Sequence, residues 1–510
     1  MAVYIVRRLV AAFFILIGAS FIVYYLLSLA GDPLAFTREI SNPTQRAAVI
    51  NTVTESLNLE TPVIGRYFLW LKDLLFHLDF GISARTQLPV WDDLSGRVLM
   101  TLKLVTAATV MSVLIGVSVG IVTALRQYSG FDYLTTFVTF VFFSLPVFWV
   151  AVILKSWGGV NFNDWLRDGA HFSVTFIVAV SIVAAIVGYS VAGGQVLRKL
   201  VFGLGTGAAM AGLLAWMSAT QWLLDPGFGP IVSAIFYLAI AIGVVAVMAG
   251  WQNRKARNTA LTVAAIGIVS YYPLQALFDA DLNVWIVLGL GLAAIGVGAF
   301  VGYAWGGFDK GQSARTGAVT ALLCAVVTFI DRAMQSWAEY SASSVIRGRP
   351  VKTIGDRESR LDGSFWVITN DTFSHLILPT LALMLISVAT YTRYSRASML
   401  EVLNQDYIRT ARAKGLTERT VVIRHAFRNA MIPLATIVAF DIGAILGGAV
   451  ITESVFEWNA MGRLFSEGLQ TQDPNPVMAF FVVVAIFAIT FNLLADITYA
   501  VLDPRIRLGH

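Results

Sequence analysis

The sequence predicts an all-α polytopic membrane protein with about twelve transmembrane helices. Hydrophobic residues make up 57% of the 510 residues, charged residues only 13%, and the mean hydropathy is +0.73. A water-soluble globular domain usually carries about 25% charged residues, so this composition excludes one. The apolar residues also gather in uncharged runs that are long enough to cross a bilayer at about 1.5 Å of rise per residue.

The first element is a long uncharged run that follows a basic pair, Arg7 and Arg8. A secretory signal would have a shorter apolar core and a small-residue cleavage site, so we interpret residues 1–30 as a retained transmembrane helix with a cytoplasmic N-terminus. Residues 31–97 are mixed and polar, with prolines as breakers and an amphipathic helical pattern at 66–76. They are predicted to form an external subdomain.

The other predicted spans share sufficient length and a lack of charge. They are the runs at 104–125, 133–154, 172–197, 200–224, 226–253, 258–278, 282–308, 316–330, 376–392, 430–452 and 477–495. The run at 316–330 is short, and it spans only if the adjoining Asp331 and Arg332 snorkel or lie at the interface. An even number of spans places both termini in the cytoplasm.

The charges of the connecting loops test this assignment of loops to the two sides of the membrane. The connections assigned to the inside carry Arg126, Arg198, Lys199, Arg254, Lys255, Arg257, Lys310 and Arg315. The short outside connections carry Asp225, Asp279 and Asp281 but no Lys or Arg, as the positive-inside rule predicts. One outside connection, 337–371, disagrees, although its length and acidic residues weaken the rule. Its basic residues are Arg347, Arg349, Lys352, Arg357 and Arg360.

A basic, helix-forming segment lies between two apolar runs at 404–433. Residues 401–414 are strong helix formers, and Gly415 can supply a left-handed C-terminal cap. Thr417 can then cap the start of a second helix, with Glu418 in its first turn. The segment is predicted to form a helix, a glycine turn and a helix on the cytoplasmic side. By charge alone, it could equally be a solvated basic loop that touches anionic lipid headgroups.

Several motifs occur in an order typical of one family. They are YIVRRLV (4–10), GDP (31–33), LNLETP (57–62), DFGISARTQLPV (79–90), SLPVFW (144–149), HLILPTLAL (375–383), QDYIRTARAKGL (405–416), RHAFRNAMIP (424–433), GGAVITESVF (447–456) and LDPRIR (502–507). In these motifs the chain resembles the B-type permease subunit of the dipeptide, oligopeptide and nickel class of binding-protein-dependent ABC importers.

The resemblance implies a six-helix permease core with about six inserted helices. The chain then divides into a first transmembrane helix (1–30), an external subdomain (31–97), core helices two and three (98–157), an inserted multi-helix membrane module (158–336), an external loop (337–371) and core helices four to six (372–510), which include a cytoplasmic coupling loop (393–429). We interpret the insert as a structural or partner-binding module at the periphery. Deleting residues 172–332 should then leave complex assembly intact.

The family's function gives expectations about partners. A similar permease pairs with a second, homologous permease as a heterodimer and forms half of a translocation pathway in the inner membrane. Two ATPase subunits bind it from the cytoplasm, and an extracytoplasmic substrate-binding protein delivers cargo. The chain itself would then be no enzyme and would bind no cofactor, since the partner subunits use ATP and Mg²⁺. Membrane lipid surrounds it, and no nucleic acid is expected because its basic residues lie in short loops.

Residue by residue, the family's coupling loop matches part of the basic segment. The matching positions are Asp406, Tyr407, Arg409, Thr410, Ala411, Arg412, Ala413, Lys414, Gly415, Arg424, His425, Arg428 and Asn429. Small residues such as Ala411 and Ala413 would allow close packing in an ATPase groove. No catalytic residue is assigned, because the stretch most similar to a P-loop has Gln312 at the position where a P-loop requires Lys. The single cysteine, Cys324, leaves no cysteine-cluster metal site, so no metal ligand is assigned.

The translocation pathway is less clear from the sequence. Candidate pathway residues are Pro146, Asp441, Gly447 and Gly448. Asp441 lies inside a predicted span, where an ionisable group costs about 2.5–3.5 kcal/mol. It is either a pathway residue that contacts peptide ammonium groups or a hydrogen-bonded packing residue. Pro146 should kink its span. Gly116 and Gly120 have the spacing of a close helix contact, as does the GLGTG stretch at 203–207.

Two other classes of function remain to be weighed. An ion-coupled secondary transporter with twelve helices should show internal repeats and buried ionisable groups at midplane. Only Asp441 lies clearly inside a span, and no half-to-half repeat is evident. The insert alone would also be compatible with a non-transporting membrane scaffold. The coupling-loop motif argues against that function. The sequence does not specify the cargo, which in this family includes dipeptides, longer peptides, nickel chelates, glutathione and sugars.

Overall fold

The computed structural model describes the backbone of residues 2–502 and the side chains of residues 6–494, apart from those at 444 and 448. Over the described residues the chain is helical, and its only β-type pairing is one isolated bridge between Ile82 and Pro89. This confirms the predicted fold class. Most of the LDPRIR motif lies outside the described residues.

The helices fall into three groups. The long core helices and the short helices joined to them are α1 (Ala2–Ala30), α4 (Val90–Leu125), α5 (Gly130–Ser144), α6 (Val147–Ile153), α7 (Phe162–Arg167), α16 (Phe365–Leu403), α17 (Asp406–Ala413), α18 (Glu418–Thr420), α19 (Arg428–Val455) and α21 (Pro474–Leu502). Helices outside the spans are α2 (Pro43–Ser56), α3 (Val63–His77) and α20 (Met461–Gln470). The inserted helices are α8 (Val174–Val191), α9 (Val196–Thr220), α10 (Gly229–Val244), α11 (Arg254–Val269), α12 (Tyr271–Phe278), α13 (Val284–Gly306), α14 (Lys310–Gln335) and α15 (Trp337–Ala342).

Every predicted span has a helical counterpart in the described part of the chain. Nine stretches there are long and apolar enough to cross a membrane, and two bent helix pairs raise the number to eleven. One of the nine, Val284–Ala342, contains α13 and α14, which make the most extensive helix contact in the molecule. Counting these two separately agrees with the predicted number of about twelve.

The core is centred on α4 and α16. Gly116 and Gly120 lie on the face of α4 that meets Tyr391 and Thr392 of α16, and a Cβ at Gly116 would lie 2.7 Å from the Cβ of Tyr391. The missing side chains therefore let the two backbones approach closely, as the spacing predicts. Near the C-terminal end of α16, Arg396 makes a bidentate ion pair with the buried Asp132 of α5 (2.8 and 2.9 Å), which fixes α5 to the core.

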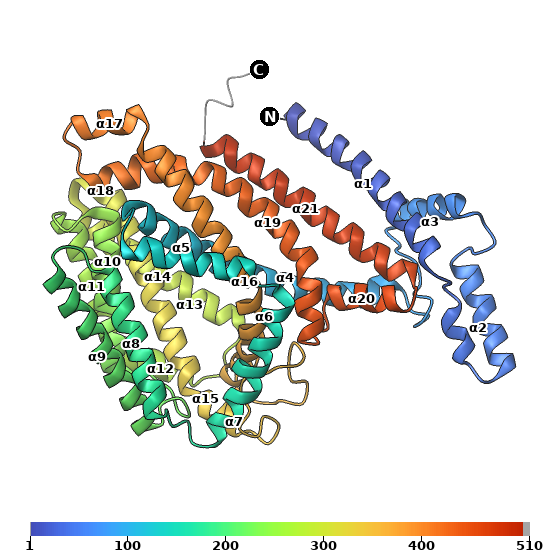
Figure 1. Cartoon of the computed structure of the whole chain (residues 1–510), viewed down its shortest axis with the longest axis horizontal. Helices are drawn as coiled ribbons and strands as arrows, with labels where there is room; N and C mark the ends of the chain where they lie inside the picture. The colour runs from blue at the N-terminus through green and yellow to red at the C-terminus, as the bar shows by residue number, and fades with distance from the viewer. Residues whose placement is uncertain (1, 503–510) are drawn as a thin grey trace.

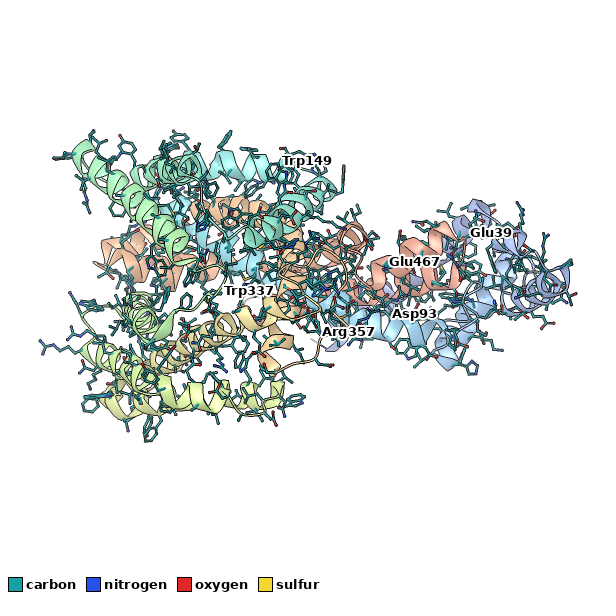
Figure 2. All side chains as sticks on the ribbon, turned by 90° about the horizontal axis from the view of Figure 1, so that it is seen from below. Glu39, Asp93, Trp149, Trp337, Arg357 and Glu467 are labelled. Carbon is teal, nitrogen blue, oxygen red and sulfur yellow. The ribbon has the colours of Figure 1, made fainter. Side chains whose placement is uncertain are left out.

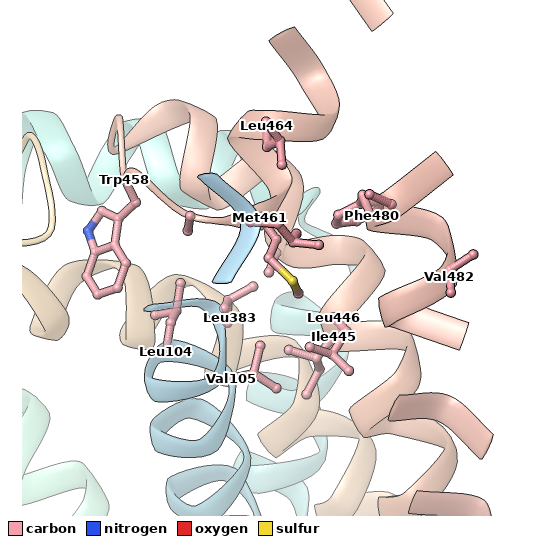
Figure 3. Close-up of a cluster of buried hydrophobic side chains, with 14 of the residues drawn as sticks. Leu104, Val105, Leu383, Ile445, Leu446, Trp458, Met461, Leu464, Phe480 and Val482 are labelled. Atoms are coloured by element: carbon pink, nitrogen blue, oxygen red, sulfur yellow. The ribbon is translucent and has the colours of Figure 1, made fainter. Parts of the chain in front are cut away.

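A second contact region joins α4 and α16 to the C-terminal helices. Figure 3 shows Leu104 of α4, Leu383 of α16, Leu446 of α19 and Phe480 of α21 pointing into one apolar cluster. Met461, at the start of α20, is fully buried in the same cluster. The amphipathic α20 thus packs its apolar face across one end of the core helices, on the side away from α17.

The external subdomain extends from the core as an arm (Figure 1). Helix α3 covers the predicted amphipathic stretch at 66–76, which is confirmed. Helix α4 begins at Val90, so the last residues assigned to the subdomain form the first turns of a core helix. Arg97 in these turns lies 2.7 Å from Asp93 and 3.7 Å from Glu467 of α20, and Figure 2 labels both acids on the arm.

The SLPVFW motif breaks the chain more sharply than predicted. Instead of one kinked span there are two helices, α5 and the stretch Val147–Arg167, whose axes differ by 99°. Leu145 is extended (φ −87°, ψ 127°) and Pro146 follows it. Proline disfavours a helical residue before it and lacks a donor for the helix, so α5 ends and α6 starts anew.

The inserted helices form a hairpin and a bundle. Helices α8 and α9 pack on each other through Gly203 and Gly207, which supports packing as the role of the GLGTG stretch. Their principal contact with the core is between α8 and α5. Helices α10 to α14 form the bundle, which reaches α16 through a cluster of Phe278, Ala333 and Trp366. Figure 1 shows the insert on the side of the core opposite to the external arm.

Both charges at the end of α14, Asp331 and Arg332, have partners within the protein. Asp331 is fully buried and accepts hydrogen bonds from the backbone N–H of Phe228 (2.6 Å) and from the hydroxyl of Tyr271 (2.7 Å). The carboxylate therefore serves the unpaired donors at the start of α10. Arg332 pairs with Asp279. With both charges satisfied by protein groups, α14 continues to Gln335 and is long enough to span.

Candidate functional site

The basic segment has the predicted order of helix, glycine turn and helix. Helix α17 ends at Ala413, Gly415 takes a left-handed conformation (φ 77°), and the Thr417 hydroxyl accepts from the N–H of Thr420 (3.4 Å). Two details differ from the prediction. Residues 401–403 complete α16, so α17 begins only at Asp406, and α18 continues through a π-helical stretch, Val421–Phe427, into α19.

Helix α17 is seated on the core by one face. Ile408 is fully buried and Ala411 is 6% exposed, and both belong to a cluster that includes Met399 of α16 and Val421. The opposite face is exposed at Tyr407, Arg409, Thr410, Arg412, Ala413 and Lys414. Ala411 therefore packs against its own chain, and of the two alanines expected to face a partner only Ala413 does. Figure 1 shows α17 at one extremity of the molecule.

Polar contacts fix the shape of the segment. The Arg412 guanidinium spans the glycine turn and bonds both carboxylate oxygens of Glu418, at 2.7 Å from Nη2 and 3.1 Å from Nε. Because both side chains are largely exposed, this pair contributes about 1 kcal/mol or less to stability, but its two-point geometry orients the turn. The amide of Asn429 donates to the Tyr407 hydroxyl (2.8 Å) and thereby ties α17 to α19.

The remaining predicted residues of the segment lie near these contacts. Asp406 starts α17 and lies 3.5 Å from Arg409. Arg424 and Arg428 are exposed. His425 is half-buried, and its carbonyl accepts from the Asn429 side chain (3.1 Å). The predicted coupling residues thus lie together at the end of α16 and the start of α19, and most of them are exposed.

The candidate pathway residues are not gathered into one pocket. Asp441 is half-buried and accepts from the hydroxyls of Ser387 (2.9 Å) and Tyr391 (2.6 Å) of α16. A hydrogen-bonded packing role is therefore satisfied by its surroundings. Gly447 has open space where a side chain would lie, and Gly448 shares its helix, α19. Pro146 stands at the break before α6, which packs against α19.

Glu453 is a buried carboxyl that the sequence analysis did not single out. It lies in the last turns of α19, beyond Gly447, where the span ends. It is fully buried and accepts from the Thr101 hydroxyl (2.7 Å) and the Gly462 N–H (2.6 Å). Burial raises the pKa of Glu453 to about 7, although the hydrogen bonds that the carboxylate accepts oppose the shift. The sequence did contain a signal for this buried residue, because a charged side chain within the apolar GGAVITESVF motif must be accommodated by protein groups.

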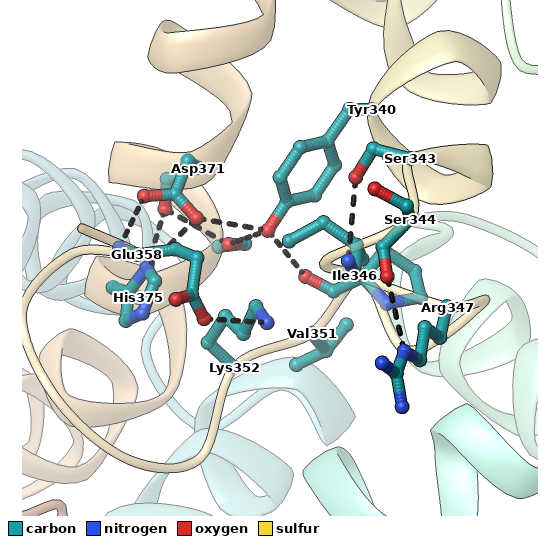
Figure 4. Close-up of polar contacts among 12 residues, drawn as sticks. Tyr340, Ser343, Ser344, Ile346, Arg347, Val351, Lys352, Glu358, Asp371 and His375 are labelled. Atoms are coloured by element: carbon teal, nitrogen blue, oxygen red, sulfur yellow. Dashed lines mark hydrogen bonds and ion pairs between the residues drawn. The ribbon is translucent and has the colours of Figure 1, made fainter. Parts of the chain in front are cut away.

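The outer loop that disagreed with the positive-inside rule is folded over the core (Figure 4). Asp371 of α16 is 4% exposed and accepts from the Glu358 N–H (2.9 Å) and the Tyr340 hydroxyl (3.3 Å). Lys352 pairs with Glu358 at 3.6 Å, and Arg349 pairs with Asp164 at 3.0 Å. Two of the five basic residues of the loop are thus neutralised within the protein.

No group of three or more His, Cys, Asp or Glu side chains that could hold a metal ion occurs within residues 6–494, positions 444 and 448 aside. The only cysteine, Cys324, is buried in the insert.

Comparison with known proteins adds a family match to this geometry. A family model described as "Binding-protein-dependent transport system inner membrane component" matches residues 116–508, well over half of the chain. The oligopeptide transport system permease protein of Mycobacterium tuberculosis is 43% identical over 155 residues, 30% of this chain and 48% of the relative. The dipeptide transport system permease protein of Escherichia coli K12 is 47% identical over 146 residues, 29% of this chain and 42% of the relative.

A putative peptide permease protein of Brucella ovis is 47% identical over 138 residues, 27% of this chain and 43% of the relative. The chain therefore spans less than half the length of the curated relatives it matches.

Proposed function

The chain belongs to the binding-protein-dependent transport system inner membrane components, and from that membership we propose that it is the permease subunit of an ATP-driven importer of di- or oligopeptides. As a multi-pass membrane protein it forms half of the translocation pathway, and a second, homologous permease forms the other half. Two ATPase subunits bind on the cytoplasmic side, where both termini lie, and an extracytoplasmic binding protein delivers the peptide.

The observation that carries this proposal is the shape of α17. The helix presents Tyr407, Arg409, Arg412 and Ala413 outward, while Ile408 anchors it to the core. A short, exposed helix that is already ordered loses little conformational entropy when a partner binds it. The segment is therefore suited to dock in a groove of an ATPase subunit.

The same contacts suggest how force would reach the pathway. Ile408 and Ala411 pack against Met399 of α16 and against Val421, which leads directly into α19. When ATP binding closes the ATPase subunits, a displacement of α17 would pull on the ends of α16 and α19. Rocking of these helices would exchange outward and inward access, each nucleotide state favouring one arrangement.

The chain supplies no catalytic group in this mechanism. ATP and Mg²⁺ are used on the partner subunits, and the permease contributes docking, a pathway and a conformational switch. An ion-coupled carrier is not favoured. Two acids of the spans, the half-buried Asp441 and the buried Asp331, have protein partners in Tyr391 and Tyr271.

Affinity purification in mild detergent tests the proposal. We expect two ATPase subunits and a second permease to co-purify, and a peptide-loaded binding protein to stimulate ATP hydrolysis. Ala413→Trp should abolish co-purification of the ATPases, because a bulky group on the exposed face of α17 blocks docking. The matched control is Ala47→Trp, at an exposed alanine of α2 in the external arm. Normal ATPase recovery with Ala413→Trp, or isolation as a lone proton-driven carrier, would contradict the proposal.

A further inference from the structure

A cavity of about 430 Å³ lies at the end of α16 opposite to α17, which is the outer end in the predicted topology. Its walls include Lys103 of α4, Asp356 and Arg357 of the outer loop, Asp371 of α16, and Trp458. Figure 2 labels Arg357 near the middle of the molecule, between the insert and the external arm. A volume of this size lies in the range of small-ligand pockets, which run from about 300 to 1,000 Å³.

Three charged side chains that line the cavity have no charged or hydrogen-bonding partner among the residues that the structure describes. Lys103, Asp356 and Arg357 make no ion pair or hydrogen bond through their side chains with any described residue. The neighbouring Lys352 has Glu358, and the carboxylate of Asp371 is occupied by the Glu358 N–H and the Tyr340 hydroxyl. Two cations and one carboxylate thus face a shared space without partners.

Both cations lie on the outer side in the predicted topology. Basic residues in short connections are biased toward the cytoplasm, and Arg357 lies in the one outside connection that departs from this bias. Lys103 stands at the outer edge of the predicted span at 104–125. Cations that are kept on the outer side and left unpaired are suited to meet a charge that arrives from outside.

We propose that this cavity is a binding site for the charged ends of a short peptide at the outer mouth of the permease. Lys103 and Arg357 bind the C-terminal carboxylate, and Asp356 accepts hydrogen bonds from the ammonium group. The proposal rests on the function proposed above, and it assigns part of the substrate selectivity to the permease. Lys103 and Arg357 are exposed and Asp356 is half-buried, so a ligand can reach all three, and bonds to charged groups of this kind are stronger than neutral ones.

Transport by the reconstituted complex tests the site. Proteoliposomes that contain the full importer receive its binding protein, saturated either with trialanine or with trialanine amide, which lacks the terminal carboxylate. Saturation removes the binding protein's own affinity from the comparison. We expect Lys103→Met to lower the ratio of trialanine import to amide import about tenfold, the effect of one lost charge-assisted hydrogen bond, with amide import unchanged. Arg357→Gln should act in the same direction.

Arg360→Met is the matched control. It removes an exposed cation of the same loop that does not line the cavity, and it should leave the ratio unchanged. An unchanged ratio in both Lys103→Met and Arg357→Gln overturns the site. So does loss of the second permease from Lys103→Met preparations, because the lysine would then serve that interface. A wild-type complex that imports neither peptide overturns the proposed function and the site together, whereas import without discrimination overturns the site alone.

Discussion

Arg419 of the coupling segment donates a hydrogen bond from Nη2 to the carbonyl of Val247 at 2.7 Å, across 172 residues of sequence. Val247 lies in the π-helical stretch Val245–Ala249 that follows α10, so its carbonyl is among the last acceptors of the helix and belongs to the negative end of the helix dipole, which favours a cation. Gly250 follows with φ 83°, and a Cβ there would collide with the Arg419 guanidinium. Arginine and glycine together let the coupling segment cap a helix of the insert.

This contact changes the view of the insert as a peripheral module. Gln312 of α14 donates to the neighbouring Met248 carbonyl (2.9 Å), so the same helix end is held from both sides. A displacement of the coupling segment must therefore either carry the end of α10 with it or break the bond from Arg419.

Arg419→Ala should loosen this junction. We expect faster amide hydrogen exchange across 245–250, and a loss of stability of about 1 kcal/mol or less because the contact is exposed. Arg424→Ala, at an exposed arginine of the same segment, is the control and should leave exchange at 245–250 unchanged. Equal exchange in wild type and Arg419→Ala would show that the bond does not hold the insert.

Asp441 should prove to be a packing residue. Asp441→Ala removes the acceptor of the buried Tyr391 hydroxyl and should cost about 1–3 kcal/mol of stability. Asp441→Asn retains one acceptor oxygen, so it should keep most of the stability and a normal transport rate per assembled complex. The measurements are thermal unfolding in detergent and uptake normalised to the amount of complex. A stable, assembled Asp441→Asn complex with no transport would instead place Asp441 in the pathway.

Much of the fold could be predicted because its information is local. Each span is an uncharged run, and the turn at Gly415 with its cap at Thr417 depends on residues next to each other in sequence. Tertiary contacts were not predictable in this way. Periodicity does not say that Ala411 faces its own core, nor that Asp331 serves donors at the start of α10.

Helix ends were also poorly predicted, for a physical reason. The first turns of α4 carry Asp92, Asp93 and Arg97, which lie beyond the apolar run and were assigned to the external subdomain. Hydropathy reports where lipid begins and not where a helix begins. Glu453 escaped notice because its partners, Thr101 and Gly462, lie on other helices.

Glu453 should make stability depend on pH near neutrality. Burial raises its pKa from 4.5 to about 7, so the folded protein holds this proton more tightly than the unfolded chain does. The contribution of this group to stability is therefore most favourable below pH about 4.5, falls as the pH rises, and is lost above pH about 7, by on the order of 3 kcal/mol. The buried Asp473, whose pKa burial also raises, acts in the same direction.

Glu453→Gln isolates this contribution. Thermal unfolding of the purified complex between pH 5.5 and 8.5, chosen to bracket the transition, should show a smaller loss of stability with rising pH than in wild type. Glu467→Gln removes an exposed carboxylate of α20 and should retain the wild-type pH dependence. A Glu453→Gln profile that parallels wild type would mean that Glu453 does not titrate in this range.

The two parts of the insert should differ in how far the core depends on them. Phe172 and Gly227 flank the hairpin of α8 and α9, and both are held at the end of α9, since Ser218 accepts from the Phe172 N–H (3.1 Å) and the Trp222 indole donates to the Gly227 carbonyl (2.9 Å). Excision of residues 173–226 can therefore be closed without moving the ends far. It removes an even number of helices, so topology is kept, and assembly with the ATPases should survive.

The wider excision of residues 172–332 should be less well tolerated than the sequence alone suggested. Trp366 of α16 is 2% exposed, packs against Phe278 of the insert and donates to its carbonyl (3.0 Å). Removing this partner exposes a large aromatic side chain and leaves its indole N–H unpaired, which should cost several kcal/mol. We expect a marked fall in yield and melting temperature for this deletion but not for the hairpin deletion. Equal stability of the two deletion variants would show that the N-terminal end of α16 is stable without the bundle of α10 to α14.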